Sequence, residues 1–396
     1  MRLYLFQKSP GNDLVVNPRP CPLSRFRQDG GLVMPFPALR IGNLTARIPV
    51  IQGGMGVGIS LSGLASAVAN QGGIGVIAGA MIGMKEPDVA KDPLTANLRA
   101  LSTEILKARQ MTDGIIGVNL MVALTTFTQM VRTAIENRAD IIFSGAGLPL
   151  DMPRHLLQMC EEKKEEFKTK LVPIVSSARA ATVIAKKWVT HFGYTPDAFV
   201  VEGPKAGGHL GFKPEELHDP AHALEVLVPQ VVDAVKPMED KCGRSVPVIA
   251  AGGVYSGADI MKFLNLGASG VQMGTRFVAT HECDADERFK QSYLAARPED
   301  VTIIKSPVGM PGRALENEFI QESRAGNKKP FKCIFHCVKT CRLRTLGCLA
   351  VFLYDPQDFL LFQQSGTRLR LLWGQCGARQ RYYFRTRAHG QPAERI

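Results

Sequence analysis

Residues 246–257 read VPVIAAGGVYSG, and this stretch decides the fold class. An apolar run over 246–251 ends in the paired glycines Gly252 and Gly253, and a helical apolar pattern then begins at Ser256. A continuous apolar run bounded by glycine is typical of a strand that is buried on both faces of a parallel sheet. We therefore expect a strand, a turn and a helix in that order.

The same order recurs along the chain. Eight apolar runs over about 230 residues match a closed (β/α)8 barrel, the TIM barrel, in number and length, and a doubly wound open sheet is the main alternative. The sequence thus predicts an α/β fold. Strands are expected at 48–52, 75–78, 115–121, 141–144, 171–176, 198–202, 246–251 and 270–273, and helices at 60–70, 127–138, 150–168, 178–192, 220–235 and 256–266. The charged run 161–170 is expected on a solvated helix face.

Glycine-rich loops follow the first, seventh and eighth expected strands. The loop within IQGGMGVG, residues 51–58, would let backbone approach a flat or anionic ligand closely, although a flexible loop is the alternative. AGG at 251–253 and MGT at 273–275 follow strands seven and eight, where barrels commonly hold a phosphate. Two unrelated turns are the alternative there, but the joint placement favours a phosphate site.

One histidine lies in a glycine-rich loop after the sixth expected strand. Residues 202–211 read EGPKAGGHLG, which places His209 beside Gly207 and Gly208. A histidine titrates near neutral pH and can accept or donate a proton there. A surface histidine without a catalytic role is the alternative.

The net charge of +12 first suggests a nucleic-acid partner, but its distribution argues against one. Residues 1–33 carry +3 and residues 342–396 carry +6, so the long middle of the chain is nearly balanced. The last 55 residues hold nine Arg and no Lys, which suggests a frame change or a gene-model error. Similarly, Met34 is a candidate for the true start.

Four of the nine cysteines are grouped late in the chain. Cys333, Cys337, Cys341 and Cys348 surround His336, and on a helix the first three would lie along one drifting face. Zinc or an iron–sulfur cluster is the alternative use, but the spacing matches neither C-x2-C zinc patterns nor ferredoxin runs. We expect free thiols and no metal, and a reducing cytoplasm, because no signal peptide opens the chain.

Five motifs in order carry a resemblance to a known family. Residues 35–341 resemble the nitronate monooxygenase family, formerly 2-nitropropane dioxygenase, which also includes the FMN-dependent enoyl-ACP reductase II. The motifs are IPVIQGGM at 48–55, GVN at 117–119, EGPKAGGHLG at 202–211, AGG at 251–253 and QMGTRF at 272–277.

The resemblance implies a TIM barrel that binds FMN without a covalent bond, with His209 near the flavin as the catalytic residue. Gly252, Gly253, Gly274 and Thr275 would hold the phosphate. The remaining implied cofactor contacts are Gly53, Gly54 and Met55 along the ring system, Asn119, Ser176 and Glu202 toward the ring or the ribityl chain, and Gly207 and Gly208 beside the histidine.

The implied activity is oxidation of an alkyl nitronate with O2 to a carbonyl compound and nitrite. An NAD(P)H-dependent enoyl-ACP or quinone reductase on the same scaffold is the alternative. No nucleic-acid or membrane partner is expected, and a homodimer is compatible with the resemblance. The expected division is an irregular extension at 1–33, the barrel at 34–285, an active-site cover with the cysteine cluster at 286–341, and an atypical Arg-rich tail at 342–396.

Overall fold

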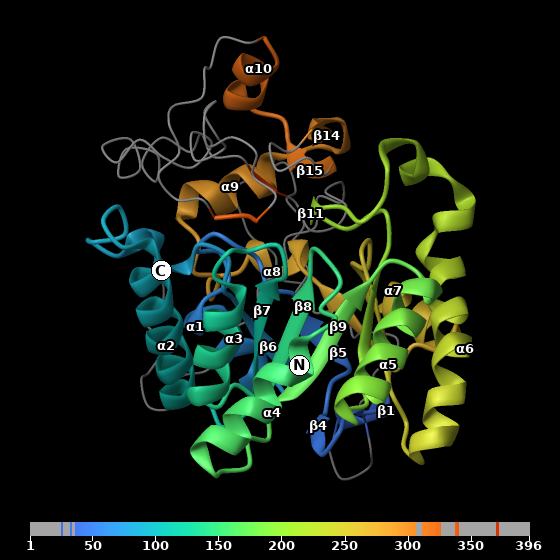
Figure 1. Ribbon diagram of the computed structural model, residues 1–396. Helices are drawn as coiled ribbons and strands as arrows, with labels where there is room; N and C mark the ends of the chain where they lie inside the picture. Colours follow the sequence, from blue (N-terminus) through green and yellow to red (C-terminus); the bar gives the residue numbers. More distant parts are fainter. Residues whose placement is uncertain are drawn as a thin grey trace.

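Eight parallel strands close into a barrel surrounded by helices (Figure 1). The computed structural model describes residues 25–26, 32–33, 36–305, 311–325, 337–339 and 370–371. The barrel strands follow one another in sequence order, and the last pairs with the first, so the TIM-barrel prediction is confirmed and the open sheet is excluded. The strands are β5 (Val50–Gln52), β6 (Ile74–Ala78), β7 (Ile115–Met121), β8 (Ile141–Gly145), β9 (Lys170–Val175), β10 (Phe199–Glu202), β12 (Val248–Ala251) and β13 (Gly270–Met273).

Helices follow the strands around the outside of the barrel. The expected helices are present, with ends that differ by up to seven residues. In chain order the helices around the barrel are α1 (Ser62–Asn70), α2 (Pro93–Met111), α3 (Phe127–Glu136), α4 (Met152–Lys163), α5 (Ala178–Phe192), α6 (Leu224–Cys242), α7 (Gly257–Asn265) and the short α8 (Thr275–Val278). Helices α2 and α8 are additional to the expected ones.

Two of these helices depart from the sequence patterns. Helix α2 was not predicted; Asp92 caps it by accepting a hydrogen bond from the backbone N–H of Thr95, and Pro93 occupies its first turn. Helix α6 runs past Pro237 to Cys242, because its buried face anchors it against the sheet and overrides the proline.

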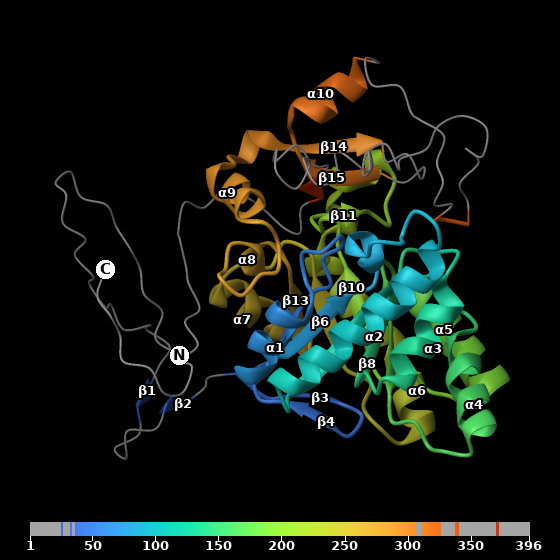
Figure 2. The same cartoon turned by 90° about the vertical axis from the view of Figure 1, so that its left-hand side faces the viewer.

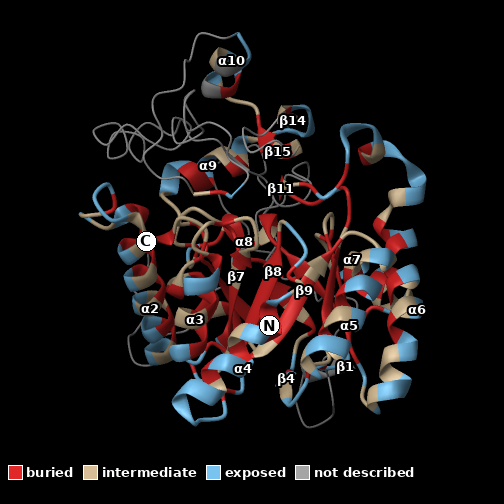
Figure 3. Cartoon of the chain, viewed as in Figure 1, coloured by how far each residue is buried: buried red, intermediate tan, exposed pale blue. Residues whose placement is uncertain are grey.

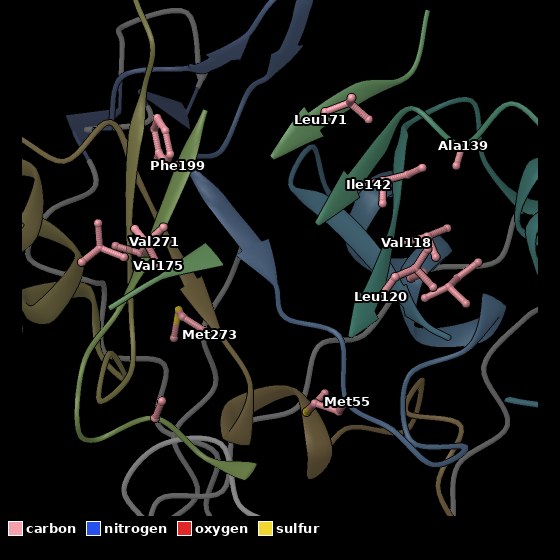
Figure 4. Close-up of a cluster of buried hydrophobic side chains, with 14 of the residues drawn as sticks. Met55, Val118, Leu120, Ala139, Ile142, Leu171, Val175, Phe199, Val271 and Met273 are labelled. Atoms are coloured by element: carbon pink, nitrogen blue, oxygen red, sulfur yellow. The ribbon is translucent and has the colours of Figure 1, made fainter. Parts of the chain in front are cut away.

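Alternate strand residues divide the core into two parts. Phe199 and Val201 of β10 pack outward in the cluster between strands and helices, whereas Val200 packs inside the barrel. Most residues of the barrel strands are buried (Figure 3). Figure 4 shows part of the outer cluster, including Met55 and Met273.

The charged run 161–170 is not a single helix face, contrary to the expectation. Helix α4 ends at Lys163, where Lys164 adopts a left-handed conformation, and Lys170 begins β9. Its acids instead pair with the neighbouring helix α3 and the loop that follows it: Glu162 with Arg132 and Glu165 with Arg138.

The amino end of the barrel is closed by the hairpin β3 (Leu39–Ile41) and β4 (Leu44–Ala46). Leu39, Ile41 and Ala46 belong to the interior cluster, so the hairpin fills that end with apolar side chains. Any ligand must therefore enter from the opposite, carboxyl end.

A group of later elements lies over the carboxyl end (Figure 2). Strand β11 (Gly208–His209) pairs with β15 (Pro311–Leu315), which pairs with β14 (Val301–Lys305). Residues 337–339 also dock there, because Val338 forms a bridge with Leu124 beyond β7. We call residues 286–305, 311–325 and 337–339 the cover segment. It includes α9 (Glu287–Ala295) and α10 (Glu318–Arg324).

The other elements are short. They are β1 (Arg25–Phe26), β2 (Leu32–Val33), β16 (Arg370–Leu371) and the 3-10 turns η1 (Ile82–Lys85), η2 (Pro214–His218), η3 (Pro220–His222) and η4 (Pro298–Asp300). Most of the expected extension at 1–33 and tail at 342–396 lies outside the described residues. Over the part of the chain that is described, no helix has the length and apolar character needed to cross a membrane.

Candidate active site

A layer of polar side chains faces the barrel interior at its carboxyl end. Val118 and Leu120 pack outward, so Asn119 between them points inward, and the same alternation turns Glu202 inward on β10. Ser176 directly follows β9 and continues its inward series after Ile174. Three residues that were expected to contact the cofactor thus share one end and one side of the sheet.

Solvent reaches part of this layer. Asn119, Ser176 and Glu202 are each half-buried, although the strand residues beside them are fully buried. Burial among protein atoms alone raises the pKa of Glu202 to about 8, so its carboxyl is mostly protonated at neutral pH. A neutral carboxyl group that is partly accessible to solvent can donate a hydrogen bond to a ligand.

The loop after β5 folds across this layer. Gly53 donates a backbone hydrogen bond of 2.8 Å to the carbonyl oxygen of Met273, which ties the loop to β13. A Cβ at Gly54 would lie 2.4 Å from the Cβ of Asn119, so only glycine fits there. The side chain of Met55 is only 1% exposed and packs in the outer core cluster. Only the backbone of Met55 is therefore available to a ligand at the barrel mouth.

Paired glycines follow β12. Gly252 and Gly253 have φ of 95° and 85°, which favours glycine. A Cβ at Gly252 would lie 2.9 Å from the backbone nitrogen of Ala206, so this turn packs directly against the loop after β10. The expected phosphate loop is therefore next to the loop that carries His209.

The carboxyl end of the neighbouring strand β13 holds two buried polar groups without hydrogen-bond partners among the described residues. Thr275, 8% exposed, directly follows Gly274, and its hydroxyl has no hydrogen-bond partner among the described residues. Gln272 is 2% exposed, and its amide nitrogen Nε2 is likewise unpaired within the described chain. Buried polar groups normally find partners, so both point to a ligand that completes them.

His209 is held in a strand and not in a free loop, which differs from the sequence expectation. Gly208 and His209 pair with Arg313 and Gly312 of β15, and Leu210 donates a 2.9 Å backbone hydrogen bond to the carbonyl oxygen of Pro311. Burial lowers the pKa of His209, so its imidazole is neutral at pH 7 and able to accept a proton.

The segment after β10 also packs on the inward layer. A Cβ at Gly211 would lie 2.4 Å from Oγ of Ser176, so this glycine lets the His209 segment approach the end of β9 closely. Gly207 is buried, and Gly208 has a φ of 74° that favours glycine. The glycines around the histidine thus serve close packing at the barrel mouth.

Sequence reasoning missed two residues of this region. Gln272 stands in the QMGTRF motif, but only its buried, unpaired amide singles it out. Arg313 donates from Nη1 to the carbonyl oxygen of Pro204, at 2.7 Å, and to that of Ala206. No sequence signal relates Arg313 to a loop that lies more than 100 residues earlier.

The cysteine cluster is described only at Cys337. Its carbonyl oxygen accepts a 3.1 Å hydrogen bond from the backbone of Thr125, and Lys339 donates to Ala123, so residues 337–339 are extended and not helical. Cys337 also lines a pocket with Thr125, Asn97 and Met81 near the barrel mouth. Cys333, Cys341 and Cys348 lie outside the described residues. Within the described chain, no three potential ligands gather into a metal site.

Known proteins place this architecture in a family. A family model described as "Nitronate monooxygenase" matches residues 39–367. A probable nitronate monooxygenase from Staphylococcus aureus is 30% identical over 309 residues, which cover 70% of this chain and 78% of that protein. An octahydro-1H-indene-4-carboxyl-CoA dehydrogenase from Mycobacterium tuberculosis is also 30% identical, over 280 residues.

The match to that dehydrogenase covers 71% of this chain but 66% of the dehydrogenase, slightly less than two thirds of its length. Among solved structures, FabK from Thermotoga maritima is similar with a TM-score of 0.53 and 29% identity, covering 70% of this chain and 74% of that one. The family model spans well over half of the chain, and the protein therefore belongs to the nitronate monooxygenase family, a family of oxidoreductases.

Proposed function

We propose that the protein is an FMN-dependent nitronate monooxygenase, which oxidises an alkyl nitronate with O2 to a carbonyl compound and nitrite. One observation carries the proposal: the half-buried polar layer and the family's glycine loops meet at the single open end of the barrel. Membership of the family and the similarity to a probable nitronate monooxygenase support it.

The glycine loops and orphaned polar groups fit a flavin phosphate. Backbone N–H groups of a glycine turn commonly bind a phosphate, and Gly252 and Gly253 form such a turn after β12, with φ of 95° and 85°. Thr275 offers a buried hydroxyl without a partner among described residues. We assign the phosphate to these residues together with Gly274.

The ring system would lie along the backbone of Gly53 and Gly54, over the inward polar layer. There Asn119 and Glu202 would hydrogen-bond its edge or the ribityl chain, and Ser176 would add a hydroxyl. The unpaired amide of Gln272 points to the same layer, since its register partner Ala251 pairs in turn with Glu202. Bound FMN would supply the redox chemistry by taking electrons from the nitronate and passing them to O2.

His209 would act on the substrate. A nitronate is already deprotonated and needs no base, whereas a neutral nitroalkane must first lose a proton from its α-carbon. The neutral imidazole of His209 is suited to accept that proton, because burial keeps its pKa low. The pairing of β11 with β15 fixes the histidine backbone in place for this role.

A second function has support from one comparison. The similarity to a dehydrogenase named for a carboxyl-CoA substrate favours a reductase or dehydrogenase acting on a thioester. In that case NAD(P)H would exchange hydride with bound FMN, and a conjugated alkene or a quinone would be the acceptor.

The test compares the two functions on one preparation. The purified full-length protein is expected to show a flavin absorption spectrum, with FMN identified after denaturation. Under anaerobic conditions, NADH or NADPH is expected to reduce the bound flavin slowly, as followed by loss of its absorbance. A nitronate is expected to reduce the flavin within the time of a single turnover. Rapid bleaching by NAD(P)H together with no response to nitronate would instead establish the reductase.

A further inference from the structure

Arg313 differs from the other arginines of the cover segment. Arg288, Arg297 and Arg324 are solvent-accessible and form ion pairs with Asp or Glu side chains close by. Arg313 has no such pair within the described residues, and burial lowers its pKa. Arginine nevertheless stays charged at neutral pH, so a partly buried cation is held here without a described counter-charge.

Two carbonyl oxygens accept hydrogen bonds from the Arg313 guanidinium. Nη1 of Arg313 donates to the carbonyl oxygens of Pro204 and Ala206, both in the loop after β10. Burying a cation is unfavourable unless hydrogen bonds compensate it, and bonds from a charged donor are about twice as strong as neutral ones. The contact therefore holds this loop firmly to β15.

The same loop rests on the expected phosphate turn. A Cβ at Gly252 would lie 2.9 Å from the nitrogen of Ala206 and 3.1 Å from the carbonyl oxygen of Gly203. A Cβ at Gly253 would lie 3.0 Å from the Cβ of Lys205. Residues 203–206 are thus packed between Arg313 on one side and the paired glycines on the other.

The histidine follows within three residues. Gly208 is the register partner of Arg313, and His209 is the partner of Gly312. The short segment 204–209 is therefore held at both ends. The guanidinium of Arg313 binds the carbonyl oxygens of Pro204 and Ala206, and the pairing of β11 with β15 holds Gly208 and His209.

We propose that Arg313 is a positioning residue that locks segment 203–209 between the cover segment and the glycines of β12, so that His209 and the phosphate turn are fixed as one unit. This inference rests on the proposed function for the role of His209, but the clamp itself is independent of the substrate. Removing the hydrogen bonds of Arg313 is therefore expected to raise amide exchange in segment 203–209, weaken FMN binding and slow turnover together.

The main test replaces Arg313 with Met, which keeps the length of the apolar stem but removes the charge and the donors. The matched control is Arg324→Met, which removes a cover-segment arginine that bonds to Glu316 and Thr302. Amide hydrogen exchange of peptide 203–211 in the flavin-free protein reports the clamp directly. FMN affinity is measured by quenching of free-flavin fluorescence.

We expect Arg313→Met to speed exchange of 203–211 by about tenfold or more and to weaken FMN binding by a similar factor, as loss of charged hydrogen bonds implies. Turnover of a nitroalkane should fall mainly in kcat, with little change in KM, because His209 is displaced and not removed. Arg324→Met should leave all three within about twofold.

A purely structural role gives a different result. If Arg313→Met lowers the melting temperature but leaves exchange of 203–211, FMN affinity and kcat at wild-type values, the proposal is wrong. Should Arg313→Met fail to fold, Arg313→Lys takes its place. In that variant the change in amide exchange of 203–211 is compared with the change in β7 of the same molecule. Equal changes in both would show that the proposal is wrong. If the wild-type releases no nitrite, the proposed function fails, while the exchange result still decides the role of Arg313.

Discussion

The carboxyl group of Glu202 makes the folding stability of the protein depend on pH in an unusual direction. Burial raises its pKa from 4.5 to about 8 in the native state, whereas the unfolded chain keeps the ordinary value. Between these values the native state binds one more proton than the unfolded state. Stability from this group is therefore full below pH 4.5, falls as the pH rises to about 8 and is constant above that.

Replacing Glu202 with Gln removes the ionisable group at nearly constant volume. The full difference between a pKa of 4.5 and about 8 corresponds to at most about 5 kcal/mol, at about 1.4 kcal/mol for each factor of ten. Glu202 is partly accessible to solvent, so water reduces the penalty of burying the charge, and we expect about 2 to 3 kcal/mol. Glu202→Gln should therefore be more stable than the wild type by that amount at pH 8.5 and about equal to it at pH 5.

Urea unfolding of the full-length, flavin-free proteins at both pH values measures this difference, because bound ligand would add its own stabilisation. Glu225→Gln is the control: Glu225 pairs with Lys262, which lowers the pKa of Glu225, so the variant should gain no stability at high pH. An advantage of Glu202→Gln that is the same at pH 5 and pH 8.5 would refute the buried, protonated carboxyl group.

Three further substitutions test other parts of the site. Gly252→Ala places a Cβ 2.9 Å from the nitrogen of Ala206 at a φ of 95°; we expect at least about tenfold weaker FMN binding by fluorescence titration, and unchanged affinity would contradict the phosphate turn. Asp284→Asn replaces a carboxylate that accepts three backbone N–H hydrogen bonds at the start of α1. Urea unfolding should show a free energy of unfolding lower by about 1 to 3 kcal/mol, and an unchanged value would contradict a stabilising role for Asp284. His209→Asn should keep FMN but slow nitrite release from a neutral nitroalkane by about 100-fold or more, whereas an equal loss with the preformed nitronate would exclude a role as base.

Much of the fold could be predicted because buried parallel strands leave a clear trace in sequence. Each expected strand, such as 270–273, matches an observed barrel strand to within two residues at either end. Helix α2 was missed because its surface is largely polar, although the cap Asp92 and the following Pro93 were available as signals. The end of α6 was misplaced because Pro237 is tolerated inside a well-packed helix.

The candidate site divides in the same way. Glycine loops and His209 could be placed at the barrel mouth, because all parallel strands end at one edge and the loops follow them directly. The clamp by Arg313 could not, since its two acceptors lie 109 and 107 residues away in sequence. The unpaired amide of Gln272 likewise emerges only when its surroundings in the folded chain are known.

We propose that this barrel oxidises a nitronate with O2. The most direct measurement supplies the FMN-loaded, full-length protein with propionate 3-nitronate in air and records nitrite release together with oxygen uptake. We expect catalytic nitrite release that needs both FMN and O2 and proceeds without NADH or NADPH. Nitrite at no more than the non-enzymatic rate, from protein with FMN bound, would contradict it.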